Sequence, residues 1–285
     1  MRIFGQIRLL LEMIKIEHTV FALPFAFMGA LLAARGLPSA RQAFFILLAM
    51  VGARSAAMAF NRLADRRIDA RNPRTADRAL PQGLISREAT IAFIAVSSLM
   101  FVLAASQLNR LSLALSPLGL GVVFFYSYTK RFTWASHLIL GACLALAPVG
   151  GWIAVRGDIQ ALPLLLSLTV LLWVAGFDIL YSLQDEDFDR TEGLYSIPSR
   201  WGRVRAMRLA AWLHGGAGLG FIGVGWLAGL GWLYFGAACL AGLLLLAEHM
   251  LLSPADLSRL NHAFFTLNGL IGIILGLATL FSLWP

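Results

Sequence analysis

The chain has 285 residues, of which 59% are hydrophobic and only 13% are charged. Soluble globular domains carry roughly 25% charged residues, so this composition excludes an ordinary soluble enzyme. The formal net charge of +8 does not indicate a nucleic-acid partner, because in a membrane protein the placement of Lys and Arg mainly reports orientation in the lipid bilayer. We therefore expect an integral membrane protein that binds no nucleic acid.

Apolar stretches long enough to cross a bilayer, which takes about 20 residues, recur along the chain. They predict an all-α, polytopic membrane protein with nine transmembrane helices. The predicted spans are 16–34, 41–61, 88–107, 111–128, 134–155, 161–183, 205–227, 229–250 and 260–283. Because no low-complexity run or Pro-rich linker divides the chain, residues 1–285 are predicted to form one domain. Residues 1–18 are amphipathic and predict an interfacial helix instead of a signal peptide.

Basic residues are distributed unequally between the two sides of these spans. With the N-terminus in the cytoplasm, 18 of the 23 Lys and Arg residues fall in cytoplasmic segments and four fall on the opposite side. The remaining basic residue, Arg54, lies inside a predicted span. Since positively charged loops stay in the cytoplasm, this pattern predicts that the two longest and most highly charged loops face the cytoplasm.

The second predicted span leads directly into the first of these loops, 61–87. Asn61, Asp65 and Asp69 follow one another at intervals of four residues, a spacing that aligns side chains along one face of a helix. Arg54 lies seven residues before Asn61, about two helical turns deeper on the same face. Because an ionisable side chain within lipid normally faces a cavity or a partner, the sequence predicts a polar pocket beneath the aspartates.

Basic residues suited to binding phosphate follow at two places. Arg74 and Arg78 lie in the first loop, and Tyr126 and Lys130 are four residues apart at the cytoplasmic end of the fourth predicted span. Cations in these positions can form charge-assisted hydrogen bonds with phosphate oxygens. For Arg131 we expect only a positively charged anchor at the end of the span.

The second charged loop, 184–204, repeats the spacing of the first. Tyr181, Asp185 and Asp189 again follow one another at intervals of four residues. Asp178 lies seven residues before Asp185, inside the sixth predicted span. Each aspartate set therefore has one charged residue about two helical turns deeper, directed toward the same interior.

Two facing sets of aspartates would repel each other unless a multivalent cation lay between them. Mg²⁺ is the natural candidate, because it takes oxygen ligands and is usually held by one or two carboxylates together with substrate phosphates. The sequence therefore predicts a site for Mg²⁺ and a phosphate-bearing substrate. Two alternatives stay open: the charged residues form only solvated loops, or Arg54 and Asp178 form a buried ion pair that serves packing.

The remaining titratable residues carry no chemistry in this interpretation. His137, His214, His249 and His262 show no metal-ligand spacing with one another or with an acid, and we assign them no chemistry. The two cysteines, Cys143 and Cys239, lie far apart in apolar segments and are interpreted as small core residues.

Taken together, these motifs resemble those of the UbiA family of membrane-bound prenyltransferases, and the resemblance spans nearly the whole chain. The first family signature is matched by Asn61, Asp65, Asp69, Arg74, Thr75 and Arg78, and the second by Tyr181, Asp185 and Asp189. The element between them is matched by Tyr126, Lys130, Arg131 and Thr133. Many members have Asp directly after the first Asn, where this chain has Arg62.

The resemblance implies a nine-helix α bundle around a cavity that opens to lipid, in the inner membrane of a bacterium. It implies transfer of a polyprenyl group from a polyprenyl diphosphate to the ring of a hydroxylated aromatic acid in quinone biosynthesis. Mg²⁺ is implied at Asp65, Asp69, Asp185 and Asp189. The roles implied for other residues are phosphate contacts from Asn61, Arg78, Tyr126, Lys130 and Tyr181, acceptor binding by Arg54, and a catalytic contribution from Asp178.

The aromatic acceptor stays open between two hydroxylated acids. The chain resembles the branch that prenylates 4-hydroxybenzoate, and similar sequences prenylate 1,4-dihydroxy-6-naphthoate in the futalosine route to menaquinone. Two other function classes fit less well. A CDP-alcohol phosphotransferase needs an Asp-Gly-x-x-Ala-Arg run that the sequence lacks, and a transporter would place its acids near the bilayer midplane, whereas these acids cluster at one surface.

Overall fold

The computed structural model of the chain describes Leu9, Glu12, Met13 and residues 19–284, and within these residues it contains helices and no strand. The helices are α2 (Thr19–Ala34), α3 (Ala40–Asp69), α4 (Arg87–Ser106), α5 (Arg110–Thr129), α6 (Ser136–Arg156), α7 (Ala161–Ser182), η2 (Leu183–Asp185), α8 (Glu186–Thr191), α9 (Ile197–Trp201), α10 (Arg203–Ala228), α11 (Trp232–Leu251), α12 (Leu260–His262), η3 (Ala263–Leu267) and α13 (Asn268–Ser282). Apart from the first three residues named, the interfacial helix predicted at 1–18 lies outside the described residues.

Each of the nine predicted spans overlaps a helix in the described part of the chain, and the last span consists of α12, η3 and α13 in sequence. Seven described helices are long and apolar enough to cross a membrane, and α2 adds a shorter apolar helix, Phe21–Ala34. Glycines and three arginines near its start make α10 less apolar, so α10 is not among the seven. The prediction of an all-α, polytopic membrane protein is confirmed.

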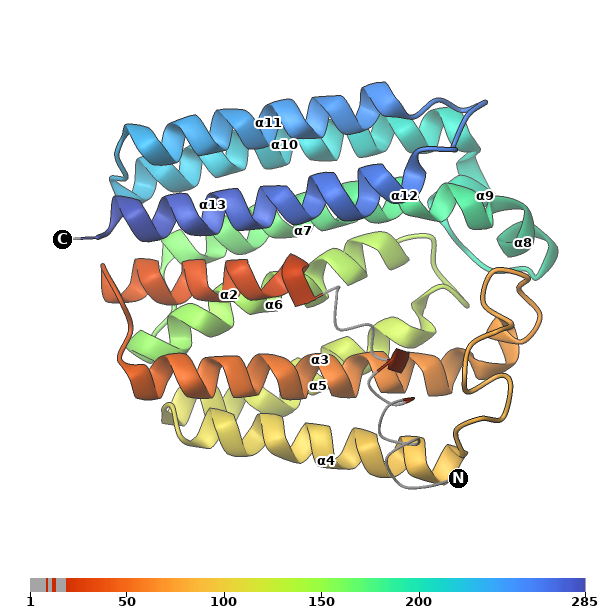
Figure 1. Cartoon of the computed structure of the whole chain (residues 1–285), viewed down its shortest axis with the longest axis horizontal. Helices are drawn as coiled ribbons and strands as arrows, with labels where there is room; N and C mark the ends of the chain where they lie inside the picture. Colours follow the sequence, from red (N-terminus) through yellow and green to blue (C-terminus); the bar gives the residue numbers. More distant parts are fainter. Residues whose placement is uncertain (1–8, 10–11, 14–18, 285) are drawn as a thin grey trace.

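The long helices lie side by side along one axis of the molecule (Figure 1). The most extensive contacts join α6 to α7, α3 to α4, α7 to α10 and α2 to α6. The main core includes Phe25, Trp173, Phe221 and Tyr234, whose side chains are fully buried. The short helices α8 and α9 and the loop that follows α3 lie together at one end of the bundle, so the two charged loops meet there (Figure 1).

Close packing of α2 on α6 depends on two glycines. A Cβ atom at Gly29 would overlap the carbonyl oxygen of Pro148, and one at Gly151 would overlap the carbonyl oxygen of Ala26. Small residues allow helix backbones to approach each other in this way inside membranes, where apolar side chains alone give little driving force for association. The contact places α2 firmly against α6, along one wall of the bundle interior.

The two aspartate sets differ in their backbone. Helix α3 continues eight residues beyond the predicted end of its span, because no Gly or Pro interrupts it, and Asn61, Asp65 and Asp69 share one α-helix as predicted. The second set lies on a helical stretch that is not regular α-helix throughout. Helix α7 ends at Ser182 and a 3₁₀ turn precedes α8, since the Gln184 side chain donates a hydrogen bond to the Tyr181 carbonyl at 2.9 Å and competes with the α-helical pattern.

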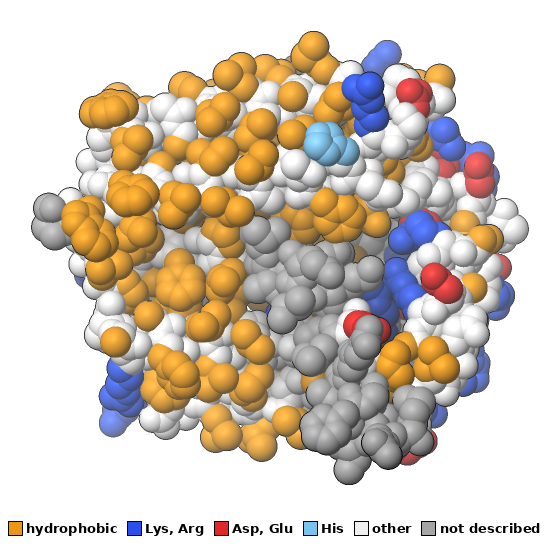
Figure 2. Space-filling view, viewed as in Figure 1, with side chains coloured by type: hydrophobic (Ala, Val, Ile, Leu, Met, Phe, Trp, Pro, Cys, Tyr) orange, Lys and Arg blue, Asp and Glu red, His pale blue; other side chains and the backbone are white. Residues whose placement is uncertain are grey.

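Apolar and charged side chains occupy different parts of the surface. Figure 2 shows apolar side chains over the flanks of the helices, whereas most of the charged side chains visible in this view gather at the end that carries α8 and α9. Trp212, Trp226, Trp232 and Met250 are each more than four-fifths exposed, as expected for side chains that contact lipid.

Candidate active site

One cavity of about 1280 Å³ brings together the candidate residues predicted from the sequence. It is lined by Arg54, Asn61, Asp65, Asp69, Arg78, Tyr126, Lys130, Asp178, Tyr181, Asp185 and Asp189. From the aspartates at one end, the cavity extends along α3 as far as Ile46, through walls formed by Met50, Leu108 and Ile153. Its depth therefore covers most of α3, with charged groups at one end and apolar side chains at the other.

Asp65 is buried at this charged end and contacts side chains from α3 and from the segment directly after α5. The amide of Asn61 donates a hydrogen bond to one carboxylate oxygen at 3.2 Å, and Lys130 Nζ lies 3.2 Å from the same oxygen. Arg131 Nη2 lies 3.2 Å from the other oxygen and donates to the Ala64 carbonyl at 2.6 Å. The prediction that Arg131 serves only as an anchor at the membrane surface is therefore wrong, because this side chain turns back onto α3.

The loop after α3 supplies the partners of the next two aspartates. Arg78 Nη1 lies 2.9 Å from Asp69, and Thr75 Oγ1 donates to the same carboxylate at 3.2 Å. Arg74 holds Asp185 with two hydrogen bonds, of 3.0 Å from Nε and 2.6 Å from Nη2. Burial opposes the charge of Arg74, but the hydrogen bonds to Asp185 and its negative charge raise the pKa of the guanidinium above its ordinary value.

These ion pairs change the physical argument for a metal. The sequence suggested that the clustered aspartates need a multivalent cation to offset their repulsion. In the structure, Lys130, Arg131, Arg78 and Arg74 already supply the compensating charge to Asp65, Asp69 and Asp185. Electrostatic repulsion therefore does not by itself require a metal ion here, and the case for one depends on the substrate.

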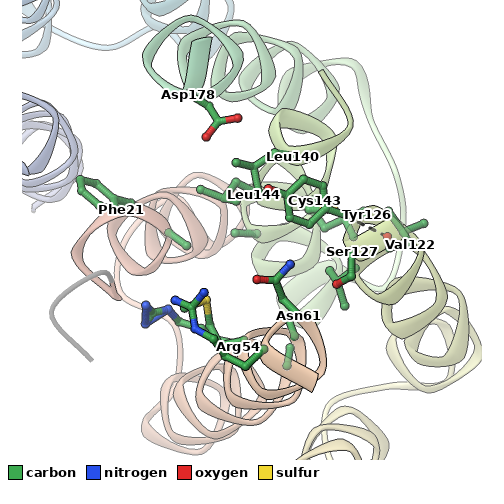
Figure 3. Close-up of a pocket in the computed structure, with 18 of the residues that line it drawn as sticks. Phe21, Arg54, Asn61, Val122, Tyr126, Ser127, Leu140, Cys143, Leu144 and Asp178 are labelled. Carbon is green, nitrogen blue, oxygen red and sulfur yellow. Dashed lines mark hydrogen bonds between the residues drawn. The ribbon is translucent and has the colours of Figure 1, made fainter. Parts of the chain in front are cut away.

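The deeper part of the cavity contains two charged groups on opposite walls. Arg54 projects from α3 and Asp178 from α7, with Tyr126, Leu140 and Leu144 between them (Figure 3). The alternative of a buried ion pair between Arg54 and Asp178 is wrong for the described residues, in which Asp178 pairs instead with His137. His137 Nδ1 lies 2.6 Å from Asp178 Oδ2, and both side chains line the cavity.

Sequence reasoning missed several residues that the fold brings to the cavity. Asn72 donates to Asp185 at 3.1 Å and accepts a hydrogen bond from the Arg74 backbone, and Ser196 lines the cavity together with Asp189. His137 and Arg62 also line the cavity. None of them belongs to the repeated four-residue spacing, and only Arg62, next to Asn61, carried a local signal.

Comparisons with known proteins agree with these motifs. Residues 22–270 match the UbiA prenyltransferase family. The chain is 31% identical over 259 residues to a 4-hydroxybenzoate octaprenyltransferase from Yersinia pseudotuberculosis serotype O:1b, which covers 89% of this chain and 87% of that protein.

Solved structures show the same fold. The apo structure of a UbiA homolog from Aeropyrum pernix K1 has a TM-score of 0.85 at 38% sequence identity, over 93% of this chain and 97% of that one. A UbiA homolog from Archaeoglobus fulgidus bound to GPP and Mg²⁺ has a TM-score of 0.69 at 16% identity, over 95% of this chain and 99% of that one. With the family match extending over most of the sequence, the chain belongs to the UbiA prenyltransferase family.

Proposed function

We propose that this protein transfers a polyprenyl group from a polyprenyl diphosphate to the ring of 4-hydroxybenzoate. The observation that carries this proposal is the division of one cavity into a charged end and an apolar chamber that contains one arginine and one aspartate. The name and the 31% identity of the relative from Yersinia pseudotuberculosis support this acceptor. The protein acts as one domain in the bacterial inner membrane, with its charged loops in the cytoplasm.

The charged end of the cavity binds the diphosphate. Lys130, Arg74 and Arg78 are held there by carboxylates, so they are already oriented before the substrate arrives and lose little conformational freedom when they meet its oxygens. Asn61, Tyr126 and Tyr181 line the same cavity and provide further polar contacts to the phosphate oxygens. Negative charge that develops on the leaving diphosphate is thereby stabilised by groups fixed in advance.

The same end of the cavity fits Mg²⁺ when the diphosphate is included. Within the described residues, no group of three or more His, Cys, Asp or Glu side chains forms a closed metal site. A Mg²⁺ ion here would take one or two carboxylates and complete its coordination with substrate oxygens and water. The carboxylates available to hold it are those of the predicted motif, Asp65, Asp69, Asp185 and Asp189. When bound, Mg²⁺ supplies charge neutralisation that makes diphosphate a better leaving group.

The apolar part of the cavity receives the prenyl chain and keeps water from the reacting carbon. Met50, Leu108, Leu144 and Ile153 supply side chains with no competing nucleophile. The allylic carbon becomes electron-poor as diphosphate leaves. Because water is excluded, this carbon reacts with the aromatic ring. Arg54 holds the carboxylate of the aromatic acid by charge-assisted hydrogen bonds, which orients the ring across the cavity toward Asp178.

Membranes from cells that express the protein test this function directly. They are incubated with Mg²⁺, a polyprenyl diphosphate and either 4-hydroxybenzoate or 1,4-dihydroxy-6-naphthoate, and the products are identified by mass spectrometry. We expect a prenylated 4-hydroxybenzoate that disappears when EDTA is added. Prenylation of the naphthoate alone would replace the proposed acceptor, and absence of product with both acids would reject aromatic prenyl transfer.

A further inference from the structure

His137 is a buried histidine that the proposed reaction has not yet used. It is the second residue of α6, its side chain is only 4% exposed, and it lines the cavity. Its two ring nitrogens contact different elements. Nδ1 lies 2.6 Å from Asp178 Oδ2 on α7, and Nε2 lies 3.3 Å from the backbone nitrogen of Ile197, the first residue of α9.

These two contacts indicate which tautomer the neutral imidazole adopts. The Ile197 backbone N–H is a donor, so Nε2 must accept this hydrogen bond and carries no proton. The proton of the neutral ring is then on Nδ1, which donates to Asp178.

The contact of Ile197 is itself held by the charged end of the cavity. Ser196, the residue before it, caps α9, and Leu194 in the same segment donates a backbone hydrogen bond to the Asp189 carbonyl at 2.8 Å. The start of α9 therefore connects the second aspartate set to His137, and through His137 to Asp178. Asp178 is thus oriented from the same segment that contributes to the diphosphate site.

The hydrogen bond from His137 fixes the orientation of the Asp178 carboxylate. Oδ2 is engaged by His137, whereas Oδ1 has no hydrogen bond within the described residues and the Asp178 side chain keeps 20% exposure, in the cavity that it lines. Oδ2 is therefore anchored and Oδ1 is left without a partner in the described part of the chain, and Figure 3 shows the Asp178 side chain across the cavity from Arg54.

From this geometry, and on the basis of the function proposed above, we infer that His137 is a positioning residue that orients Asp178 to remove the ring proton of the aromatic acceptor. The allylic C–O bond breaks and its electron pair leaves with diphosphate. The ring then forms the new C–C bond with its π electrons. The ring C–H bond breaks next, its electrons restore aromaticity, and its proton goes to Asp178 Oδ1.

A pair of substitutions separates this role from simple packing. In His137→Asn the side-chain amide nitrogen occupies nearly the place of Nδ1 and can still donate to Asp178. In His137→Gln the longer side chain reaches the position of Nε2, so it can keep the contact with Ile197 but loses the bond to Asp178. Both variants carry a neutral side-chain amide in place of the imidazole. In each variant, an unchanged KM for the prenyl diphosphate shows that the charged end of the cavity is intact.

The readouts are kcat and the kinetic isotope effect with the acceptor deuterated on the ring. We expect His137→Gln to lower kcat by roughly 10–100-fold, less than the roughly 10²–10⁴-fold that a general base contributes because Asp178 itself remains. The variant should also reveal a primary isotope effect, because proton removal becomes rate-limiting. His137→Asn should keep kcat within a few-fold of the wild type and show no such effect.

Several results would overturn the inference. One is a His137→Gln variant whose kcat and isotope effect equal those of the wild type. Another is an equal loss of kcat in both variants with no isotope effect in either. In either case the wild-type protein still makes the prenylated acid, so the proposed function stands. Absence of product from the wild-type protein with either aromatic acid would overturn both the function and the role of His137.

Discussion

Two groups of buried polar side chains in this molecule have similar chemistry and different surroundings. The cavity cluster consists of Asp65, Asp69 and Asp185 with their basic partners, and it lines the large cavity. The core network consists of Trp173, His214, Glu248, His249 and Asn268, which connect α7, α10, α11 and α13. Within the described residues, no member of the core network lines the cavity.

The hydrogen bonds of the core network close on the protein itself. Asn268 accepts from the Trp173 indole at 2.7 Å and donates to Glu248 at 3.0 Å and to the Ala263 carbonyl at 3.3 Å. His214 contacts His249 at 3.0 Å and the Trp173 carbonyl at 3.2 Å. Ala263 begins the π-helical turn η3, so the Asn268 side chain satisfies a carbonyl where the helix departs from the α pattern.

Both groups place polar or charged side chains inside the molecule, but only the cavity cluster is accessible from the cavity. Access to the cavity therefore distinguishes residues suited to binding from residues that support the fold. A buried ionisable residue in a membrane protein suggests function by default. Here that rule applies to Asp178 and Arg54, which border open space, and we expect it to fail for Glu248, which is 1% exposed and surrounded by packed side chains. Substitutions in the two groups should therefore affect different measurements.

The largest effect is expected from Asp185→Ala or Asp65→Ala in the cavity cluster. Each removes a carboxylate of the charged end and leaves Arg74 or Lys130 without its partner. We expect prenyl transfer in membranes to fall by about 10²–10³-fold, as when a preorganised electrostatic group is lost from an active site, while the protein still inserts. Glu248→Gln is the matched control, since it changes a buried acid outside the cavity. Activity retained in both aspartate variants would reject the metal–diphosphate site.

Arg54→Ala tests the deeper part of the cavity. A charge-assisted hydrogen bond contributes about 1.5–3 kcal/mol, so the KM for the aromatic acid should rise roughly 10–150-fold. The KM for the prenyl diphosphate should change by less than twofold or so, because the cavity cluster does not include Arg54. An acceptor KM equal to that of the wild type would show that the carboxylate binds elsewhere.

Arg62→Ala provides the reciprocal measurement on the same helix. Arg62 lines the cavity two turns above Arg54, next to the aspartates, and within the described residues its side chain makes no ion pair or hydrogen bond. We expect the KM for the prenyl diphosphate to rise about threefold to tenfold, consistent with one added cation near the phosphate oxygens. The acceptor KM should stay constant, and a rise in it would place the aromatic acid nearer the aspartates than we propose.

The sequence was sufficient for the periodic features of both the fold and the site. Apolar runs located the helices to within a few residues, as for the span predicted at 161–183 and observed as Ala161–Ser182. The four-residue spacing identified the aspartates that line the cavity. Helix length at α3 was underestimated because a polar sequence can continue a helix once it has left the lipid.

What the sequence could not supply were contacts between distant segments. The pairing of His137 with Asp178, 41 residues apart, depends on how α6 packs against α7. The role of Arg131 depends on the direction that its side chain takes at the end of α5. Neither residue has a local pattern that distinguishes it from a core histidine or a membrane-surface arginine, so only the packed fold reveals these partners.

Asn268→Leu tests the core network. The substitution leaves the Trp173 indole N–H and one oxygen of Glu248 without their hydrogen-bond partners. Each buried polar group left unpaired lowers the free energy of unfolding by about 1–3 kcal/mol. We expect a lower melting temperature in detergent and unchanged KM values for both substrates. A large change in either KM, at unchanged melting temperature, would mean that the core network acts on the cavity through Phe264, which lines it from η3.

Glu248→Gln is expected to have the smallest effect, although it replaces a fully buried acid. Oε1 accepts the hydrogen bond from Asn268, and a glutamine oxygen can accept it equally well. Oε2 has no hydrogen-bond partner within the described residues, so the substitution removes no favourable contact there. The melting temperature and both KM values should match those of the wild type. A loss of stability as large as that of Asn268→Leu would show that Oε2 has a partner of its own. The folded protein would then require the carboxyl group of Glu248, and an amide in its place would not be sufficient.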